Sequence, residues 1–141
     1  MNVPLPPFLS TPSARSAFAW LAIRLLLAGL IAAHGWARLL AGGVVPFGAF
    51  LDSQGFALGF HLASLITGIE IIGSLSLLLG RFVAPLCLVF ASIYSMGIVL
   101  VHAKAGWFVV GLGRNGAEYS VLLIVCLLAV GLQHVKARSE A

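Results

Sequence analysis

Four long apolar segments constrain the fold of this chain more than any other feature of its sequence. They cover residues 17–40, 55–79, 82–101 and 117–134, and each is long enough to cross a hydrocarbon core of about 30 Å. Of the 141 residues, 61% are hydrophobic and 9% are charged, whereas a soluble domain averages about 25% charged residues. Because backbone groups inside lipid must be hydrogen-bonded within the protein, these segments are predicted to be helices. The sequence therefore predicts an all-α integral membrane four-helix bundle.

The connections between these segments differ in kind. Gly80 and Arg81 form a tight link between the second and third segments, which predicts an antiparallel helical hairpin. The other two links, residues 41–54 and 102–116, are long and glycine-rich but keep apolar and aromatic residues. We expect them to fold back onto the bundle or to lie in the membrane interface. We divide the chain into a flexible proline- and serine-rich N-terminus (1–16), the four-helix domain (17–135) and a polar tail (136–141).

Four spans place both long links on one side of the membrane and both termini on the other. The side with the termini and the short link carries Arg15, Arg81, Lys136 and Arg138. The side with the long links carries Arg38, Lys104 and Arg114. Cytoplasmic segments carry the excess of Lys and Arg. This count favours cytoplasmic termini and long links on the outer side.

Two opposite charges are expected at similar depth in the inner half of the membrane. Counted from the inner ends of their segments at a rise of about 1.5 Å per residue, Arg24 is about 10 Å deep and Glu70 about 14 Å deep. A charge in a membrane is costly unless it is paired. We therefore predict a contact between Arg24 and Glu70. The pair would act as a structural clasp between two helices, as a polar wall of a ligand site or proton path, or as both.

The remaining polar residues gather toward the outer side, and three interpretations of them stay open. They are His34, Arg38, His61, His102, Glu118 and Tyr119. Imidazole and carboxylate groups suit transition metals, although the spacing of His34, His61, His102 and Glu118 does not resemble a metal motif. A pocket of such residues could instead hydrogen-bond the carbonyls of a quinone, with a histidine passing the proton. The third interpretation is that they close helix ends and tie down the two links.

Other classes of function have no support in the sequence. There is no basic patch with interleaved aromatic residues, so nucleic-acid binding is not expected. A Ser-His-Asp arrangement, a phosphate-binding glycine loop and a dinucleotide fingerprint are all missing. Cys87 and Cys126 stand singly in apolar runs and form no metal-type spacing. If the chain takes part in redox chemistry, the reaction itself belongs to a partner or a bound cofactor.

A set of polar marks in order along the chain resembles the DoxX family of small four-span membrane proteins. The resemblance runs from residue 24 to residue 132 through "RLLLAGLIAAHGWARLL", "FGAFL", "GIEIIGSLSLLLGRFVAPL" and "VHAKAGWFVVGLGRNGAEYSVLLI". The marks are Arg24, the His34–Gly35 pair, Arg38 where lysine is more usual, Glu70, His102, and the Glu118–Tyr119 pair. The set is far more specific than any one of its members.

The resemblance implies a four-helix protein of the bacterial inner membrane. Relatives in the family include small subunits of a thiosulfate:quinone oxidoreductase and companions of other redox enzymes, while most members have no assigned activity. We therefore expect a quinone or quinol site beside a partner oxidoreductase. Its candidate residues are Arg24, His34, Arg38, Glu70, His102, Trp107, Glu118 and Tyr119, with His34, His102 and Glu118 as proton-transfer candidates. Arg114 and Asn115 would form its rim.

Two alternatives remain beside the quinone hypothesis. The chain could be a non-catalytic anchor or assembly subunit of a larger membrane complex, in which the polar residues only specify packing. A small-molecule carrier is the third hypothesis. It would require a homo-oligomer, because the chain has few spans and no internal repeat.

Overall fold

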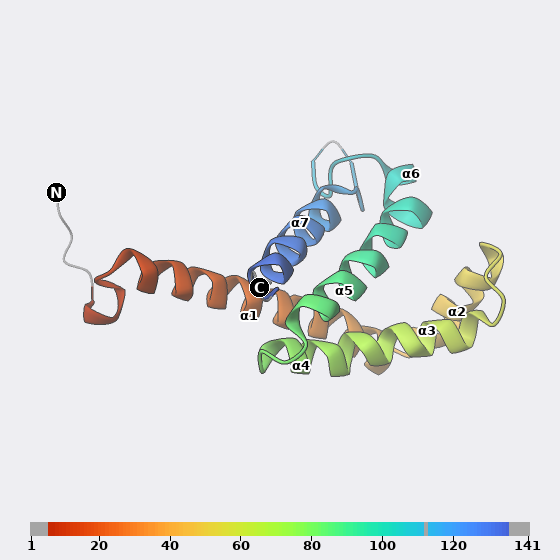
Figure 1. Cartoon of the computed structure of the whole chain (residues 1–141). Coiled ribbons are helices and arrows are strands. Elements are labelled where there is room, and N and C mark those ends of the chain that lie inside the picture. Colours follow the sequence, from red (N-terminus) through yellow and green to blue (C-terminus); the bar gives the residue numbers. More distant parts are fainter. Residues whose placement is uncertain (1–5, 112, 136–141) are drawn as a thin grey trace, which may run out of the picture.

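The fold is all-helical, as the sequence predicts. The computed structural model describes residues 6–111 and 113–135, and it contains no strand within these ranges (Figure 1). The predicted tail at residues 136–141 and the first five residues of the predicted N-terminal segment lie outside them. The helices are η1 (Pro7–Leu9), α1 (Pro12–Leu40), α2 (Val44–Ser53), α3 (Gly59–Gly68), η2 (Ile69–Gly73), α4 (Ser74–Leu78), α5 (Val83–Gly97), η3 (Ile98–His102), α6 (Ala103–Ala105) and α7 (Glu118–Gln133).

Three continuous helices are long and apolar enough to cross a membrane. They are α1 with 29 residues, α3–η2–α4 with 20 residues (Gly59–Leu78) and α5–η3–α6 with 23 residues (Val83–Ala105). The fourth predicted span corresponds to α7, which has 16 residues and is about 24 Å long. Helix α7 is thus shorter than the about 30 Å hydrocarbon core that the other three can span.

The four long helices form two antiparallel pairs, which we call hairpins. Neither is the predicted hairpin of the second and third segments, since α4 and α5 meet mainly near their shared turn. Helix α1 packs along α3–η2–α4, and α5 packs along α7 (Figure 1). The hairpins meet near the tight turn between α4 and α5, which we call the turn end of the bundle. Toward the two long links, the link end, α5 leans away from α3 (Figure 1). Both links lie at this end, as four spans require.

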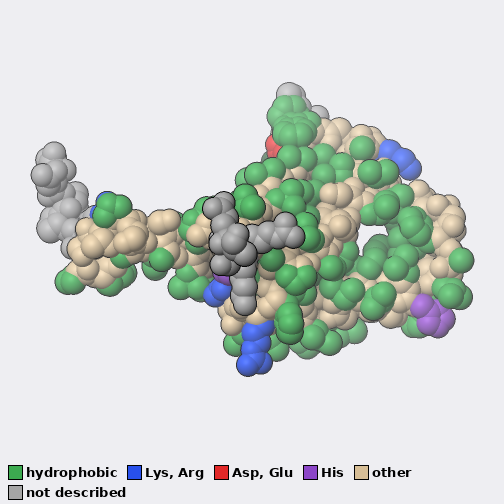
Figure 2. All heavy atoms as spheres, in the orientation of Figure 1, with side chains coloured by type: hydrophobic (Ala, Val, Ile, Leu, Met, Phe, Trp, Pro, Cys, Tyr) green, Lys and Arg blue, Asp and Glu red, His purple; other side chains and the backbone are tan. Residues whose placement is uncertain are grey.

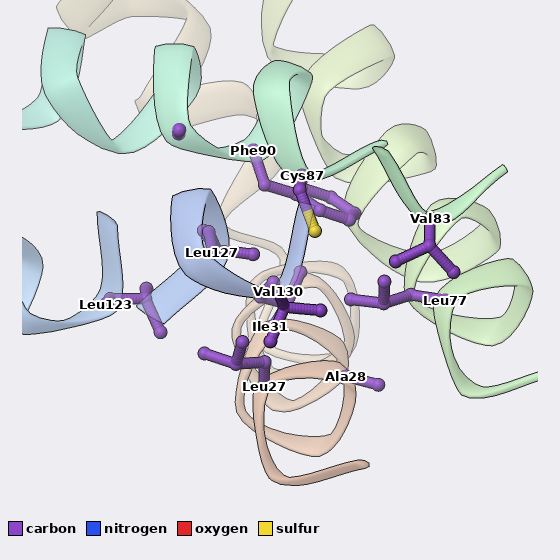
Figure 3. Close-up of a cluster of buried hydrophobic side chains, with 11 residues drawn as sticks. Leu27, Ala28, Ile31, Leu77, Val83, Cys87, Phe90, Leu123, Leu127 and Val130 are labelled. Atoms are coloured by element: carbon purple, nitrogen blue, oxygen red, sulfur yellow. The ribbon is translucent and has the colours of Figure 1, made fainter. Parts of the chain in front are cut away.

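The hydrophobic core joins the two hairpins near the turn end. Helix α1 contributes Leu27, Ala28 and Ile31, which face α4, α5 and α7 (Figure 3). The other labelled side chains are Leu77 from α4, Val83, Cys87 and Phe90 from α5, and Leu123, Leu127 and Val130 from α7. Because the core fills only this end, the divergence of the helices leaves space between them at the link end.

The first long link folds back onto the bundle, as expected, and most of it is the helix α2. A Cβ added at Gly48 would lie 2.7 Å from the Cα of Phe60, so the absence of a side chain lets α2 approach the start of α3 closely. Asp52 fixes the same crossing, because its Oδ1 accepts a hydrogen bond of 2.8 Å from the backbone N–H of Gly59. Helix α2 therefore forms a wall beside the space between the hairpins.

Helix α1 begins at Pro12, before the predicted residue 17. Thr11 caps it, since its Oγ1 accepts a hydrogen bond of 3.2 Å from the N–H of Ala14, and proline is favoured in a first helical turn. The N-terminal part of α1 projects beyond the other helices at the turn end (Figure 1). This overhang changes which residues of α1 face which residues of α4.

Candidate functional site

A cavity of about 790 Å³ lies between the two hairpins at the link end. Figure 2 shows the corresponding hollow between the part of the molecule formed by α5 and the part formed by α2 and α3. Most of its walls are apolar side chains from α2, α3, α5 and η3, such as Phe50, Ile66, Ile93 and Leu100. A smaller set of polar side chains also lines it: His34, Arg38, Glu70, Ser92, Tyr94, His102, Asn115, Tyr119 and Ser120.

An ion pair between Arg38 and Glu70 forms the centre of the polar part. The Nη1 of Arg38 donates to the Oε2 of Glu70 at 2.5 Å. The side chain of Glu70 is 2% exposed and that of Arg38 is 21% exposed. The carboxylate is thus enclosed, while part of the guanidinium remains accessible from the cavity.

The predicted contact between Arg24 and Glu70 is therefore wrong. Arg24 lies at the turn end, where its Nη1 donates to the Nε2 of His134 at 3.4 Å and its guanidinium lies against Gly80. We had expected residues 17 and 79, the inner ends of their segments, to lie at the same depth in the membrane. Because the N-terminal part of α1 extends beyond the other helices, Arg24 instead lies level with Gly80. The next arginine along α1, Arg38, consequently lies opposite Glu70.

Local features of both helices bring this pair together. Glu70 lies in η2, a single π-helical turn inside an otherwise α-helical span, and such turns are frequent at functional sites. Opposite it, Gly35 of α1 has no side chain, and a Cβ there would lie 3.0 Å from the Cβ of Glu70. The close approach of the two backbones explains why a short carboxylate side chain can reach the guanidinium of Arg38.

Other groups complete the hydrogen bonding and packing of the pair. Arg38 Nη1 also donates to the Oγ1 of Thr67 at 3.2 Å, and its Cζ lies 4.6 Å from the centroid of the Phe47 ring. The hydroxyl of Tyr94 donates to the Oε1 of Glu70 at 3.4 Å. These contacts tie α1, α2, α3 and α5 to one charged centre.

Three aromatic rings lie together beside the ion pair. The ring centroid of His34 is 6.2 Å from that of Tyr94 and 6.3 Å from that of Tyr119. All three residues line the cavity. Within the described residues, no hydrogen bond joins the imidazole of His34 or the hydroxyl of Tyr119 to another protein group, so both polar groups are free to bind a ligand.

His102 and Glu118 hold the second long link in place. The Nδ1 of His102 donates to the backbone carbonyl of Asn115 at 2.7 Å, and the Oε1 of Glu118 accepts from the N–H of Val109 at 2.8 Å. His102 also lines the cavity, whereas Glu118 does not. Trp107 does not line it either, and 54% of its surface is exposed.

The residues of the metal hypothesis are not brought together. His61 is exposed at the start of α3, where its ring packs against Phe60 at a centroid distance of 5.8 Å. His34 and His102 line the cavity from different helices, and the carboxylate of Glu118 bonds the second link. Across residues 6–111 and 113–135, no three His, Cys, Asp or Glu side chains form a group that could hold a metal ion.

Five of the eight candidate residues thus line one cavity, and three do not. The five are His34, Arg38, Glu70, His102 and Tyr119, and the three are Arg24, Trp107 and Glu118. Thr67, Tyr94 and Phe47 also contact the ion pair, and we did not predict them from the sequence. Thr67 precedes Glu70 by three residues, which puts both on one helix face, and Tyr94 is a polar residue in the middle of an apolar segment. These signals could have identified two of the three.

The arrangement can bind a molecule with an apolar body and a polar end. The apolar walls offer burial, and the polar end offers donors from His34, Arg38 and Tyr119 beside the carboxylate acceptor of Glu70. Ligand sites of this kind, apolar with a few convergent polar groups, measure about 300–1,000 Å³.

Comparison with known proteins gives one match. The DoxX family model matches residues 19–103, which include most of α1, all elements from α2 to η3, and six of the nine polar residues that line the cavity. No curated protein and no solved structure matches the chain. Glu118 and Tyr119, two of the polar marks in the sequence, lie beyond the matched range.

Proposed function

The chain belongs to the DoxX family, and on this premise we propose that it is a membrane subunit of a redox system. In this proposal it binds a quinone or quinol in the cavity at the link end and works beside a partner oxidoreductase. The observation that carries the proposal is the combination of a large apolar cavity with the Arg38–Glu70 pair at its polar part. Membership of the family and the three long apolar helices make the chain an integral membrane protein.

The chemistry of the cavity fits a quinone. A quinone ring and its isoprenoid tail are apolar and need a wall such as that made by Phe50, Ile66 and Leu100. Its two carbonyl oxygens only accept hydrogen bonds, so the site must supply donors. His34, Tyr119 and the accessible part of Arg38 are the donors nearest to the ion pair.

Each polar residue has a role that follows from its surroundings. Arg38 would orient a carbonyl oxygen of the quinone while remaining bonded to Glu70, and the enclosed carboxylate of Glu70 would hold the guanidinium in place. His34 would exchange a proton with the bound ring, because imidazole can both donate and accept near neutral pH. A bound quinone supplies the acceptor for two electrons and two protons, and the partner oxidoreductase supplies the electrons.

The location of the protein is part of the proposal. We place it in a bacterial inner membrane with both termini in the cytoplasm, which is supported by the excess of basic residues in the turn and termini. The cavity then opens on the outer half of the membrane, where a quinone diffusing in the lipid could enter between α3 and α5. Exposed Leu88 and Val89 flank this side of the cavity.

A cavity-filling variant tests the proposal without touching the polar groups. Gly97 lines the cavity, and nothing lies within 4 Å of a Cβ added there. Gly97→Leu should therefore fold normally and occupy part of the binding space. Gly29→Leu is the matched control, because Gly29 is equally open but does not line the cavity. The assay is titration of the purified protein with a short-chain ubiquinone, followed by tryptophan fluorescence.

We expect saturable binding by the wild type and by Gly29→Leu, and weaker binding by roughly tenfold or more in Gly97→Leu, since a leucine side chain competes for the same volume. Equal binding by all three proteins, or no saturable binding by the wild type, would exclude this cavity as the quinone site.

A non-catalytic anchor or assembly subunit is the second candidate function. It is supported by the hydrogen bonds of His102 and Glu118, which connect helix ends to the second link and leave neither group free for proton transfer at those atoms. In that case the Arg38–Glu70 pair serves only to fix α1 against α3 and η2. A double variant with apolar residues at positions 38 and 70 that restores both folding and quinone-dependent activity would favour the anchor.

A further inference from the structure

A second cavity of about 470 Å³ lies at the turn end, far along α1 from the first. One face of α1 forms one wall, and the end of α7 forms the other. The lining residues are Ser13, Ser16, Ala17, Trp20, Leu21, Arg24, Gln133 and His134. Six of these eight carry a polar group, and each of the six can donate a hydrogen bond.

Arg24 gives this cavity a positive charge that no described side chain compensates. Among the described residues its guanidinium makes one hydrogen bond, to His134 at 3.4 Å, and its Nε is buried without a partner. The one ion pair between described side chains is that of Arg38 with Glu70. Most of the five N–H donors of Arg24 are thus available to a ligand.

His134 is oriented toward Arg24 by its own helix. Its Nδ1 donates to the backbone carbonyl of Val130 at 2.9 Å, because a carbonyl oxygen can only accept. In the neutral ring, the Nε2 then carries a lone pair that accepts a hydrogen bond from Arg24. The ring therefore holds the guanidinium at the cavity without neutralising its charge.

The height of the cavity in the bundle indicates what can reach it. Arg24 is level with the turn that contains Gly80 and with the end of α7, so it lies at one end of the membrane-spanning part. In a bilayer crossed by these helices, the headgroups of one leaflet would lie near this level. Trp20, a residue type enriched at membrane interfaces, is in the same cavity.

From these observations we infer that the cavity at Arg24 binds a phosphate group, held by the guanidinium, while the hydroxyls of Ser13 and Ser16 line the cavity further along the same helix. Arginine and phosphate form charge-assisted hydrogen bonds, often two in parallel. Basic pockets between membrane helices bind anionic lipid headgroups in this way. The site is separate from the proposed quinone cavity, and Arg24 then acts as a lipid-binding residue rather than as part of a redox site.

The test is native mass spectrometry of the full chain released from detergent, with phosphatidylglycerol, phosphatidylcholine or inorganic phosphate added. Arg24→Gln removes the charge from the cavity. Arg81→Gln removes the same charge from an exposed position at the same end of the bundle. Ser16→Leu fills the cavity and leaves every charge in place, and Ala19→Leu is its control on an exposed position outside the cavity.

We expect one phosphatidylglycerol to be retained by the wild type, Arg81→Gln and Ala19→Leu, and roughly tenfold weaker retention in Arg24→Gln and Ser16→Leu. Competition by inorganic phosphate at equal affinity identifies a free phosphate as the ligand, whereas its failure to compete identifies the lipid. Equal retention by Ser16→Leu and Ala19→Leu overturns the inference, even if Arg24→Gln fails to fold. Equal loss in Arg24→Gln and Arg81→Gln also overturns it, since general charge then explains the binding.

Discussion

Removal of Arg38 alone from the Arg38–Glu70 pair should destabilise the bundle far more than removal of both partners. Arg38→Met leaves the carboxylate of Glu70 in a site where 2% of its side chain is exposed. Its remaining partner is the hydroxyl of Tyr94 at 3.4 Å. A buried charge that loses its partner typically costs about 3–5 kcal/mol of unfolding free energy. We expect Arg38→Met to lie in that range.

Glu70→Leu should cost less. The side chain of Arg38 is 21% exposed and keeps its contacts with Thr67 and Phe47, so it can remain solvated from the cavity. We expect a loss of about 1–3 kcal/mol, the range for a hydrogen bond to a charged group. The double variant has no buried charge at this position, and its loss should be close to that of Glu70→Leu alone.

The assay is a double-mutant cycle measured by equilibrium unfolding in mixed detergent micelles with increasing sodium dodecyl sulfate. We expect a coupling energy of about 3–5 kcal/mol, because the cost of Arg38→Met disappears once Glu70 is replaced by leucine. The average for neutral hydrogen bonds between membrane helices is about 0.6 kcal/mol. Arg24→Met combined with Glu70→Leu is the control cycle, and it should be additive within about 0.5 kcal/mol because the two residues do not touch. Coupling of Glu70 to Arg24 rather than to Arg38 would refute the placement of α1 against α3 and η2.

Three further outcomes follow from the packing. Gly48→Ala should lower the unfolding free energy by about 1–3 kcal/mol, because its Cβ would lie 2.7 Å from the backbone of α3. The control, Gly29→Ala, lies in open space and should be neutral or stabilising. Equal effects of the two substitutions would contradict the close packing of α2 on α3. Glu118→Ala should speed hydrogen exchange of the backbone amides in the second link by roughly tenfold or more, since the N–H of Val109 loses its carboxylate acceptor. An unchanged exchange rate would argue against the hydrogen bond between Val109 and Glu118. In detergent, a maleimide should modify half-buried Cys126 before fully buried Cys87, and the reverse order would contradict the core.

The sequence was sufficient for the helices and for most residues of the site, but not for their pairing. Apolar length predicts the spans, because a membrane protein must pair every backbone group within helices. The depth of a residue can be counted along its span only if all spans begin at the same depth in the membrane. Helix α1 begins beyond the other helices, so Arg38 rather than Arg24 is the partner of Glu70. Nothing in the residues of the overhang says how far it extends beyond the bundle.

The size of the cavity could not be predicted from the sequence either. It results from the angle between the two hairpins, which depends on where the core side chains gather. Leu77, Phe90 and Leu127 fill the turn end, yet similar leucines and valines near the link end remain exposed. Periodicity gives each residue a face on its own helix but does not fix which neighbour that face meets. We selected His102 and Glu118 as candidate site residues because they occur in the ordered set of polar marks along the chain. Their hydrogen bonds to the second link depend on how that link folds, which the order of residues does not reveal.

Photo-crosslinking with an azido-quinone tests the proposed quinone site most directly. We expect the azido-quinone to label the peptides that contain Glu70, Tyr94 and His34. Labelling should fall strongly in Gly97→Leu but not in Gly29→Leu. Labelling that is spread over the exposed faces of α4 and α7, and that is unchanged in Gly97→Leu, would contradict it.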